Sequence, residues 1–259
     1  MTEIDLVKKI KEKKELSGLP DSYVLDSLKN ELKKINFPNI DSIKKSEQKI
    51  IIKLVRAELR RSAGMFQKSK EKSWKSRFTL LEENKIEELL KTHSSTNERL
   101  NFYPKLKELI FSLKPSSILD LGCGINPIAI AKPNIKYYAV DIQQDDLDIV
   151  KKFFQKNNIS GETFVQDISS SSTENLPSVD LCLMFKLLDI LEKKGHRQAE
   201  QILKNIKTNF FIISFSTKTL SGRSMLHQKR PWLERILGKL NYHFKIEKSD
   251  NEIFYIIEK

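Results

Sequence analysis

The clearest chemical pattern of the sequence lies at residues 116–127, SSILDLGCGINP. Its apolar first half predicts a short buried strand, which is followed by Gly122 and Gly124 and then by a helix opening at Asn126 and Pro127. Glycine tolerates a positive φ and lets the backbone approach a ligand closely. In an open α/β sheet such a turn lies at the carboxyl end of a strand, where ligands bind. The segment therefore predicts a cradle for a nucleotide-type cofactor.

The spacing within this loop narrows the choice of cofactor. A dinucleotide fingerprint needs a third glycine at the position of Pro127, so NAD and FAD are disfavoured. The sequence contains no G-x-x-x-x-G-K-[ST] pattern, which excludes a P-loop nucleotidase. The pattern D-x-G-x-G, running from Asp120 to Gly124, resembles motif I of S-adenosylmethionine-dependent methyltransferases.

Two carboxylates follow the next strand-like runs. Asp141 ends an apolar run nineteen residues after Gly122, and a ribose-binding carboxylate is expected ~20 residues on. Asp167 lies near the end of the run at 163–168, in a position suited to the adenine amino group. Either residue alone is more simply a solvated loop carboxylate. The ordered set favours S-adenosylmethionine.

The net charge of +12 is concentrated in one region. Residues 44–77 contain twelve Lys or Arg and three Glu, a local net charge of +9. A lysine-rich composition with solvated helix faces is one explanation for this excess. Its concentration indicates a polyanion partner, because phosphate neutralisation supplies most of the sequence-independent affinity for nucleic acid.

The remaining composition indicates a protein of the cytoplasm. No run approaches ~20 consecutive apolar residues, so no membrane span is expected, and the N-terminus lacks the apolar core of a signal peptide. The two cysteines, Cys123 and Cys182, form no C-x-x-C motif, which indicates a reducing compartment and no metal site.

The pattern of apolar residues divides the chain into two predicted domains. Residues 1–114 are predicted to be helical, with a capping box formed by Ser95 and Glu98 at the start of a helix that runs to about Leu113. Residues 115–259 alternate strands and helices and end in a β-hairpin formed by 243–247 and 252–258. This predicts the α/β fold of class I methyltransferases, a Rossmann-like seven-stranded sheet with a terminal antiparallel hairpin, preceded by an all-helical domain.

A more specific resemblance rests on four segments, LLKTHSSTNERL (89–100), SSILDLGCGINPIAI (116–130), LCLMFKLLDILEKK (181–194) and FIISFSTKTLSGR (211–223). With them the chain resembles the aminoglycoside-resistance 16S rRNA methyltransferases of the Arm/Rmt/Fmr type. These enzymes methylate N7 of a guanosine in the decoding A site of the small ribosomal subunit. The resemblance implies a monomer that acts on 16S rRNA within the 30S subunit, with a helical N-terminal RNA-binding domain.

The resemblance also implies roles for particular residues. Arg99 is expected to bind the methionine carboxylate, since a guanidinium forks bidentately onto carboxylates. The other expected cofactor residues are His93, Ser94, Ser95, Gly122, Gly124, Asp141, Asp167, Ile168 and Phe185. Lys186 is expected to orient the target base. The expected RNA contacts are Lys53, Arg56, Arg60, Arg61, Lys68, Lys218 and Arg223.

The implied chemistry is an in-line displacement that needs no general base, because guanine N7 carries an unprotonated lone pair. Catalysis then rests on orienting two bound partners. Three residues depart from the family pattern, namely Ser216, Asp189 and Lys194. Two alternatives stay open, a methyltransferase for another rRNA nucleotide and a non-catalytic rRNA-binding or assembly factor that has kept the cofactor pocket.

Overall fold

The computed structural model describes residues 2–36, 44–62, 74–168, 175–191, 196–219 and 222–259. Its centre is a seven-stranded sheet in the order β3-β2-β1-β4-β5-β7-β6. The strands are β1 (Ser117–Leu121), β2 (Lys136–Asp141), β3 (Gly161–Val165), β4 (Leu181–Phe185), β5 (Phe210–Ser216), β6 (His243–Lys248) and β7 (Glu252–Glu258). The first five are parallel, whereas β7 is antiparallel to both β5 and β6. The predicted fold class is therefore confirmed.

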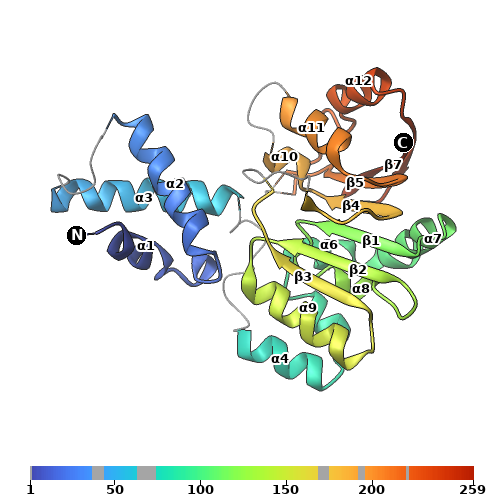
Figure 1. Ribbon diagram of the computed structural model, residues 1–259, viewed down its shortest axis with the longest axis horizontal. Helices are drawn as coiled ribbons and strands as arrows, with labels where there is room; N and C mark the ends of the chain where they lie inside the picture. Colours follow the sequence, from blue (N-terminus) through green and yellow to red (C-terminus); the bar gives the residue numbers. More distant parts are fainter. Residues whose placement is uncertain (1, 37–43, 63–73, 169–174, 192–195, 220–221) are drawn as a thin grey trace.

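Helices cover both faces of the sheet because successive strand residues point to opposite sides. In β1, Ile118 belongs to the core under one set of helices and Leu119 to the core under another. The first set is α4 (Trp74–Glu82), α5 (Ile86–Leu90), α7 (Tyr103–Ser112), α8 (Pro127–Ile130) and α9 (Gln144–Lys156). The second set is α10 (Leu188–Leu191), α11 (Arg197–Asn205) and α12 (Pro231–Lys239). The result is a three-layered α/β body (Figure 1).

The first three helices form a lobe with a core of its own. They are α1 (Glu3–Lys11), α2 (Asp21–Lys34) and α3 (Lys45–Ser62), with the short 3₁₀ helix η1 (Lys14–Leu16) between α1 and α2. Their core of Leu, Ile and Val side chains is separate from both cores of the sheet, and the lobe lies beside the α/β body (Figure 1). Ile142, directly after β2, packs against the lobe, and the Gln144 amide donates to the Gly18 carbonyl at 3.1 Å. The helices α4, α5 and α7 instead share the core of the sheet, although they precede residue 114.

The segment from 94 to 112 departs from the prediction of one continuous helix. It is divided into α6 (Ser94–Arg99), a 3₁₀ turn η4 (Leu100–Phe102) and α7. Pro104 explains the break, because proline lacks an amide donor and is tolerated only in the first turn of a helix, where it lies in α7. The helix α12 was not predicted.

The predicted capping box of Ser95 and Glu98 is wrong. The N-cap of α6 is His93, and no side chain caps this helix end. Ser95 instead accepts a hydrogen bond from Arg99 at 2.8 Å, and Glu98 pairs with Lys186. Ser95 is therefore engaged by Arg99 and Glu98 by a tertiary ion pair, in place of the capping hydrogen bonds that the sequence pattern suggested.

In the part of the chain that the structure describes, no helix has both the length and the apolarity required to cross a membrane.

Gly161 tests how tightly the sheet is packed. A Cβ at this first residue of β3 would lie 2.3 Å from a ring carbon of Phe154 in α9. We expect Gly161→Ala to lower the free energy of unfolding by about 1–3 kcal/mol, as overpacked cores do. Gly238→Ala is the matched control, since a Cβ there meets nothing within 4 Å, and alanine should stabilise this helical position by about 0.5–1 kcal/mol. Urea unfolding measures both, and an unchanged stability of Gly161→Ala would contradict the packing.

Candidate functional site

The site is built around the glycine loop that follows β1. Gly122 and Gly124 have φ values of +63° and +49°, a left-handed conformation that residues with a Cβ rarely adopt. The space around both is also closed, because a Cβ on Gly122 would lie 2.8 Å from Leu187 and one on Gly124 would lie 2.8 Å from His93 Nε2. The two glycines are therefore required by conformation and by packing.

Asp141, at the end of β2, holds this loop in place. Its Oδ2 accepts from the Gly124 amide at 2.7 Å, and its Oδ1 accepts from the Gln143 amide at 2.9 Å. Burial, followed by the neighbouring Asp146 charge, raises the pKa of Asp141 to about 6. The residue is half-buried at the carboxyl end of β2.

Asp120 forms a second acceptor next to the loop. Its Oδ2 accepts from Asn126 Nδ2 at 2.8 Å and from the Tyr137 hydroxyl at 2.7 Å. Its Oδ1 is buried and has no hydrogen-bond partner among the described residues. Burial raises the pKa of Asp120 to about 6, against the effect of the two hydrogen bonds.

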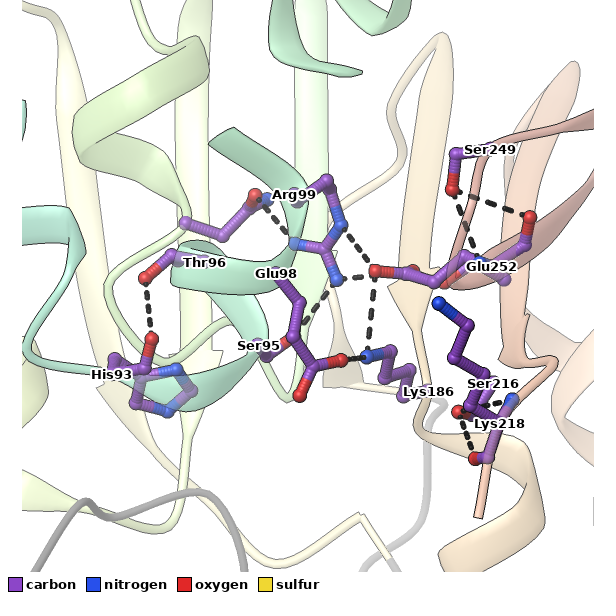
Figure 2. Close-up of polar contacts among 12 residues, drawn as sticks. His93, Ser95, Thr96, Glu98, Arg99, Lys186, Ser216, Lys218, Ser249 and Glu252 are labelled. Carbon is purple, nitrogen blue, oxygen red and sulfur yellow. Dashed lines mark hydrogen bonds and ion pairs between the residues drawn. The ribbon is translucent and has the colours of Figure 1, made fainter. Parts of the chain in front are cut away.

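A buried ion pair lies beside this loop. Arg99 Nε donates to Glu252 Oε1 at 3.0 Å and Arg99 Nη2 donates to Glu252 Oε2 at 3.2 Å, and both side chains are only 1% exposed. Arg99 also donates to Asn126 Oδ1 at 3.3 Å, and its guanidinium lies 4.7 Å from the centre of the Phe185 ring. Figure 2 shows Arg99, from α6, pointing at Glu252, from β7.

Lys186 extends the same network. It follows β4 with a φ of +56°, and its ammonium pairs with Glu98 and lies 3.5 Å from Glu252 Oε1 (Figure 2). Ser214 Oγ donates to Glu252 Oε2 at 2.6 Å. Burial acts to raise the pKa of Glu252, but the Arg99 and Lys186 charges outweigh it and hold that pKa below its ordinary value. One carboxylate thus joins two cations that come from different elements.

The other predicted cofactor residues lie around the loop with different degrees of burial. His93 is buried against Gly124, and burial, with the positive charges around it, lowers its pKa to about 4 against the effect of Asp146. Ser94 and Asp167 are half-buried, and Ile168 is buried in the core on the α10–α12 side. His93 is therefore a neutral side chain that supports the loop.

The predicted RNA-binding residues fall into different environments. Arg56 donates to the carbonyl of Ile10 at 3.2 Å, and Arg60 pairs with Glu15 at 2.7 Å, so both tie α3 to the rest of the lobe. Lys53 and Arg223 are exposed, and Lys218 is half-buried. Lys68 and the Arg61 side chain lie outside the described residues.

Two of the three residues that depart from the family pattern have hydrogen-bond or ion-pair partners in the structure. Ser216 Oγ donates to the Lys218 carbonyl at 2.7 Å and thereby holds the turn after β5. Asp189 pairs with Arg230 at 2.8 Å. Lys194 lies outside the described residues.

The sequence reasoning missed Glu252, Asn126, Asp146 and Arg77. Glu252 had a visible signal, since it is the carboxylate that opens an apolar terminal strand. Asp146 and Arg77 had none, because they form an ion pair across 69 residues of sequence. Among the described residues, no group of three or more His, Cys, Asp or Glu side chains is arranged to hold a metal ion.

The residues present fit a nucleoside cofactor. Gly122 and Gly124 give the loop a left-handed backbone, Asp141 presents a carboxylate to it, and the buried Asp120 Oδ1 has no hydrogen-bond partner among the described residues. A parallel sheet that ends in an antiparallel β7, with this loop at the end of β1, defines the class I methyltransferases.

Comparisons with known proteins identify the family. The pattern of the family described as "Ribosomal RNA methyltransferase (FmrO)" matches residues 83–256. A 16S rRNA (guanine(1405)-N(7))-methyltransferase of Serratia marcescens is 31% identical over 194 residues, which cover 72% of this chain and 75% of that protein. One of Proteus mirabilis is 28% identical over 191 residues, covering 66% of this chain and 64% of that protein. The chain belongs to the FmrO family of ribosomal RNA methyltransferases.

Solved structures agree with this assignment. The 16S rRNA methylase RmtB has a TM-score of 0.77 at 25% identity, with 100% of this chain and 99% of that chain covered. The 16S rRNA methyltransferase RmtF, solved in complex with S-adenosyl-L-homocysteine, has a TM-score of 0.82 at 21% identity, with 99% and 98% covered. The RmtF likeness supports the fold.

The Gly124–His93 contact leads to a prediction. Gly124→Ala adds a left-handed alanine, which costs about 1–2 kcal/mol, and also a clash with His93, which adds about 1–3 kcal/mol. Gly222→Ala is the matched control, because Gly222 has a φ of +80° but a Cβ there meets nothing within 4 Å. Urea unfolding should show a clearly larger loss for Gly124→Ala. Equal losses would show that His93 does not support the loop.

Proposed function

We propose that this protein transfers a methyl group from S-adenosylmethionine to N7 of a guanosine in the decoding A site of 16S rRNA, within the 30S subunit. The observation that carries the proposal is the convergence of the glycine loop, Asp141, Arg99 and Lys186 at one edge of the sheet, in a member of the FmrO family. The protein acts as a monomer in the cytoplasm, and aminoglycoside resistance is the expected consequence for the host.

Different residues contact different parts of the cofactor. Gly122 and Gly124 admit the amino acid end, and Asp141 accepts from the ribose hydroxyls. Asp167 and Ile168 frame the adenine. Glu252 and Ser95 engage Nε and Nη2 of Arg99, and Asn126 accepts one hydrogen of Nη1, so the second Nη1 hydrogen is the donor that remains to meet the methionine carboxylate. When bound, S-adenosylmethionine supplies an electrophilic methyl group on a sulfonium.

Lys186 orients the target base. Its ammonium is held by Glu98 and Glu252, which fixes its direction. A charged lysine is a hydrogen-bond donor and no base, and guanine O6 beside N7 is an acceptor. Donation to O6 holds the ring so that the N7 lone pair meets the methyl carbon in line. Orientation of this kind is the main source of rate enhancement here.

The α1–α3 lobe supplies part of the rRNA contact. On α3, Lys49 and Lys53 are exposed and lie one turn apart, next to Ile50 and Leu54, which are 60% and 38% exposed. Two solvent-facing lysines can neutralise phosphates, because they are not engaged in holding the lobe together. Arg56 and Arg60 act differently, since their contacts are internal to the lobe.

Methyl transfer to ribosomal particles tests the proposal directly. Purified enzyme is incubated with tritiated S-adenosylmethionine and 30S subunits, and borohydride and aniline cleavage followed by primer extension maps the product. One new stop at an A-site guanosine of 16S rRNA is expected, and Lys186→Ala should reduce transfer strongly. A stop at another nucleotide would indicate a different rRNA specificity. Binding to 30S without transfer would indicate a non-catalytic factor.

The raised pKa of Asp141 predicts the pH dependence of cofactor binding. The carboxylate accepts hydrogen bonds when ionised, so affinity should be constant well above pH 6 and fall as the pH drops through about 6. We expect the dissociation constant for S-adenosylhomocysteine to rise about fourfold between pH 7.5 and 5.5, following the ionised fraction. Asp141→Asn should bind more weakly and with a flat profile. Calorimetry measures both, and a wild-type profile that stays flat would contradict the role of Asp141.

The exposed lysines of α3 lead to a prediction about binding to 30S subunits. The double variant Lys49→Glu, Lys53→Glu should weaken binding to 30S subunits by about tenfold or more, and the loss should shrink as salt is raised. A double variant of two exposed lysines on the α/β body, Lys107→Glu and Lys151→Glu, is the charge-matched control. Filter binding at several salt concentrations measures the affinities. Equal losses in the two variants would show that the effect is one of net charge.

A further inference from the structure

A buried pair of charges lies behind the glycine loop, away from the Arg99 network. Arg77, in the first turn of α4, donates from Nη1 to Asp146 Oδ1 at 2.5 Å. Asp146 lies in the first turn of α9, and the two residues are 6% and 1% exposed. Figure 1 shows α4 lying against α9. A carboxylate in the first turn of a helix is stabilised by the helix dipole. A carboxylate as deeply buried as that of Asp146 also needs an oppositely charged partner.

The same arginine also holds the turn that leads into α6. Arg77 Nη2 donates to the Thr92 carbonyl at 3.1 Å. The next residue, His93, has its Nε2 4.0 Å from Asp146 Oδ2 and lies where a Cβ on Gly124 would collide with it. Arg77 and Asp146 are thus joined to the turn that carries His93 and, through His93, to Gly124.

The pair connects the segments that form two walls of the site. One wall is the turn at 92–95, which leads to Arg99. The other is the segment from the end of β2 into the first turn of α9, where Asp146 follows Asp141 by five residues. Arg77 joins the two segments, because it donates to the Thr92 carbonyl in the first and to the Asp146 carboxylate in the second.

We propose that Arg77 and Asp146 are positioning residues of the cofactor site, holding the turn at 92–95 and His93 against the Gly122–Gly124 loop. This inference rests on the proposed function, because it assumes that the loop holds S-adenosylmethionine. Neither residue touches the cofactor in this account. Their loss should loosen the loop and weaken cofactor binding more than it disturbs the chemical step.

The experiment compares Arg77→Met with Leu203→Ala, a control variant in α11 on the opposite face of the sheet, where Leu203 is fully buried. Both variants should lower the thermal unfolding temperature. Arg77→Met should also raise the dissociation constant for S-adenosylhomocysteine about tenfold, the loss expected for one charged hydrogen bond. Leu203→Ala should leave that constant unchanged, and Arg77→Lys should recover part of the loss in Arg77→Met.

Hydrogen–deuterium exchange of the ligand-free protein adds a readout that does not depend on the cofactor. Peptides covering 92–95 and 122–126 should exchange faster in Arg77→Met and at wild-type rates in Leu203→Ala. If Arg77→Met does not fold, Asp146→Asn takes its place, since it removes the charge and keeps the shape. Exchange in these peptides that matches the control overturns the inference. Failure of the wild type to bind S-adenosylhomocysteine overturns the proposed function instead, and the exchange comparison still decides the positioning role.

Discussion

The ion pair between Arg99 and Glu252 is the contact on which the site depends. It joins the last residue of α6 to the first residue of β7 across 153 residues of sequence, and it is almost completely removed from solvent. Desolvation of two charges is costly, so such a pair is stable only when its geometry is good and its remaining hydrogen-bonding groups are satisfied. Here the pair is bidentate, and Ser95, Asn126 and Ser214 supply the further hydrogen bonds.

The consequence is a site whose cations are placed before any ligand arrives. Glu252 faces Arg99 on one side and Lys186 on the other, so one strand of the terminal hairpin sets the direction of both. For a reaction that needs no general base, fixed direction is what the protein has to provide. The antiparallel β7 is therefore part of the proposed site as well as part of the sheet.

Local sequence features predicted much of this structure. The glycine loop and Asp141 could be placed because a strand, a turn and a carboxylate follow one another in a short stretch of chain. The helix at 231–239 was also within reach, since Pro231 opens it and Leu233, Ile236 and Leu237 are spaced for one buried face. Its omission was an error of interpretation.

The long-range contacts could not be predicted in this way. Ser95 and Glu98 have the spacing of a capping box, yet Ser95 accepts from Arg99, which is itself held by Glu252, and Glu98 pairs with Lys186, 88 residues along the chain. Arg77 and Asp146 are ordinary helical residues in sequence and become paired only when α4 packs on α9. Such pairs depend on the assembled fold, which no local pattern encodes.

A double-mutant cycle on Arg99 and Glu252 tests this account most directly. The free energy of unfolding is measured in urea for the wild type, Arg99→Met, Glu252→Gln and the double variant. Arg99→Met leaves Glu252 with Lys186 alone and Glu252→Gln leaves Arg99 without a carboxylate, so each single change should cost about 3–5 kcal/mol. The double variant should cost little more than either one, which gives a coupling energy of at least about 2 kcal/mol. Losses that add to within about 0.5 kcal/mol would contradict the claim that this pair holds the site together.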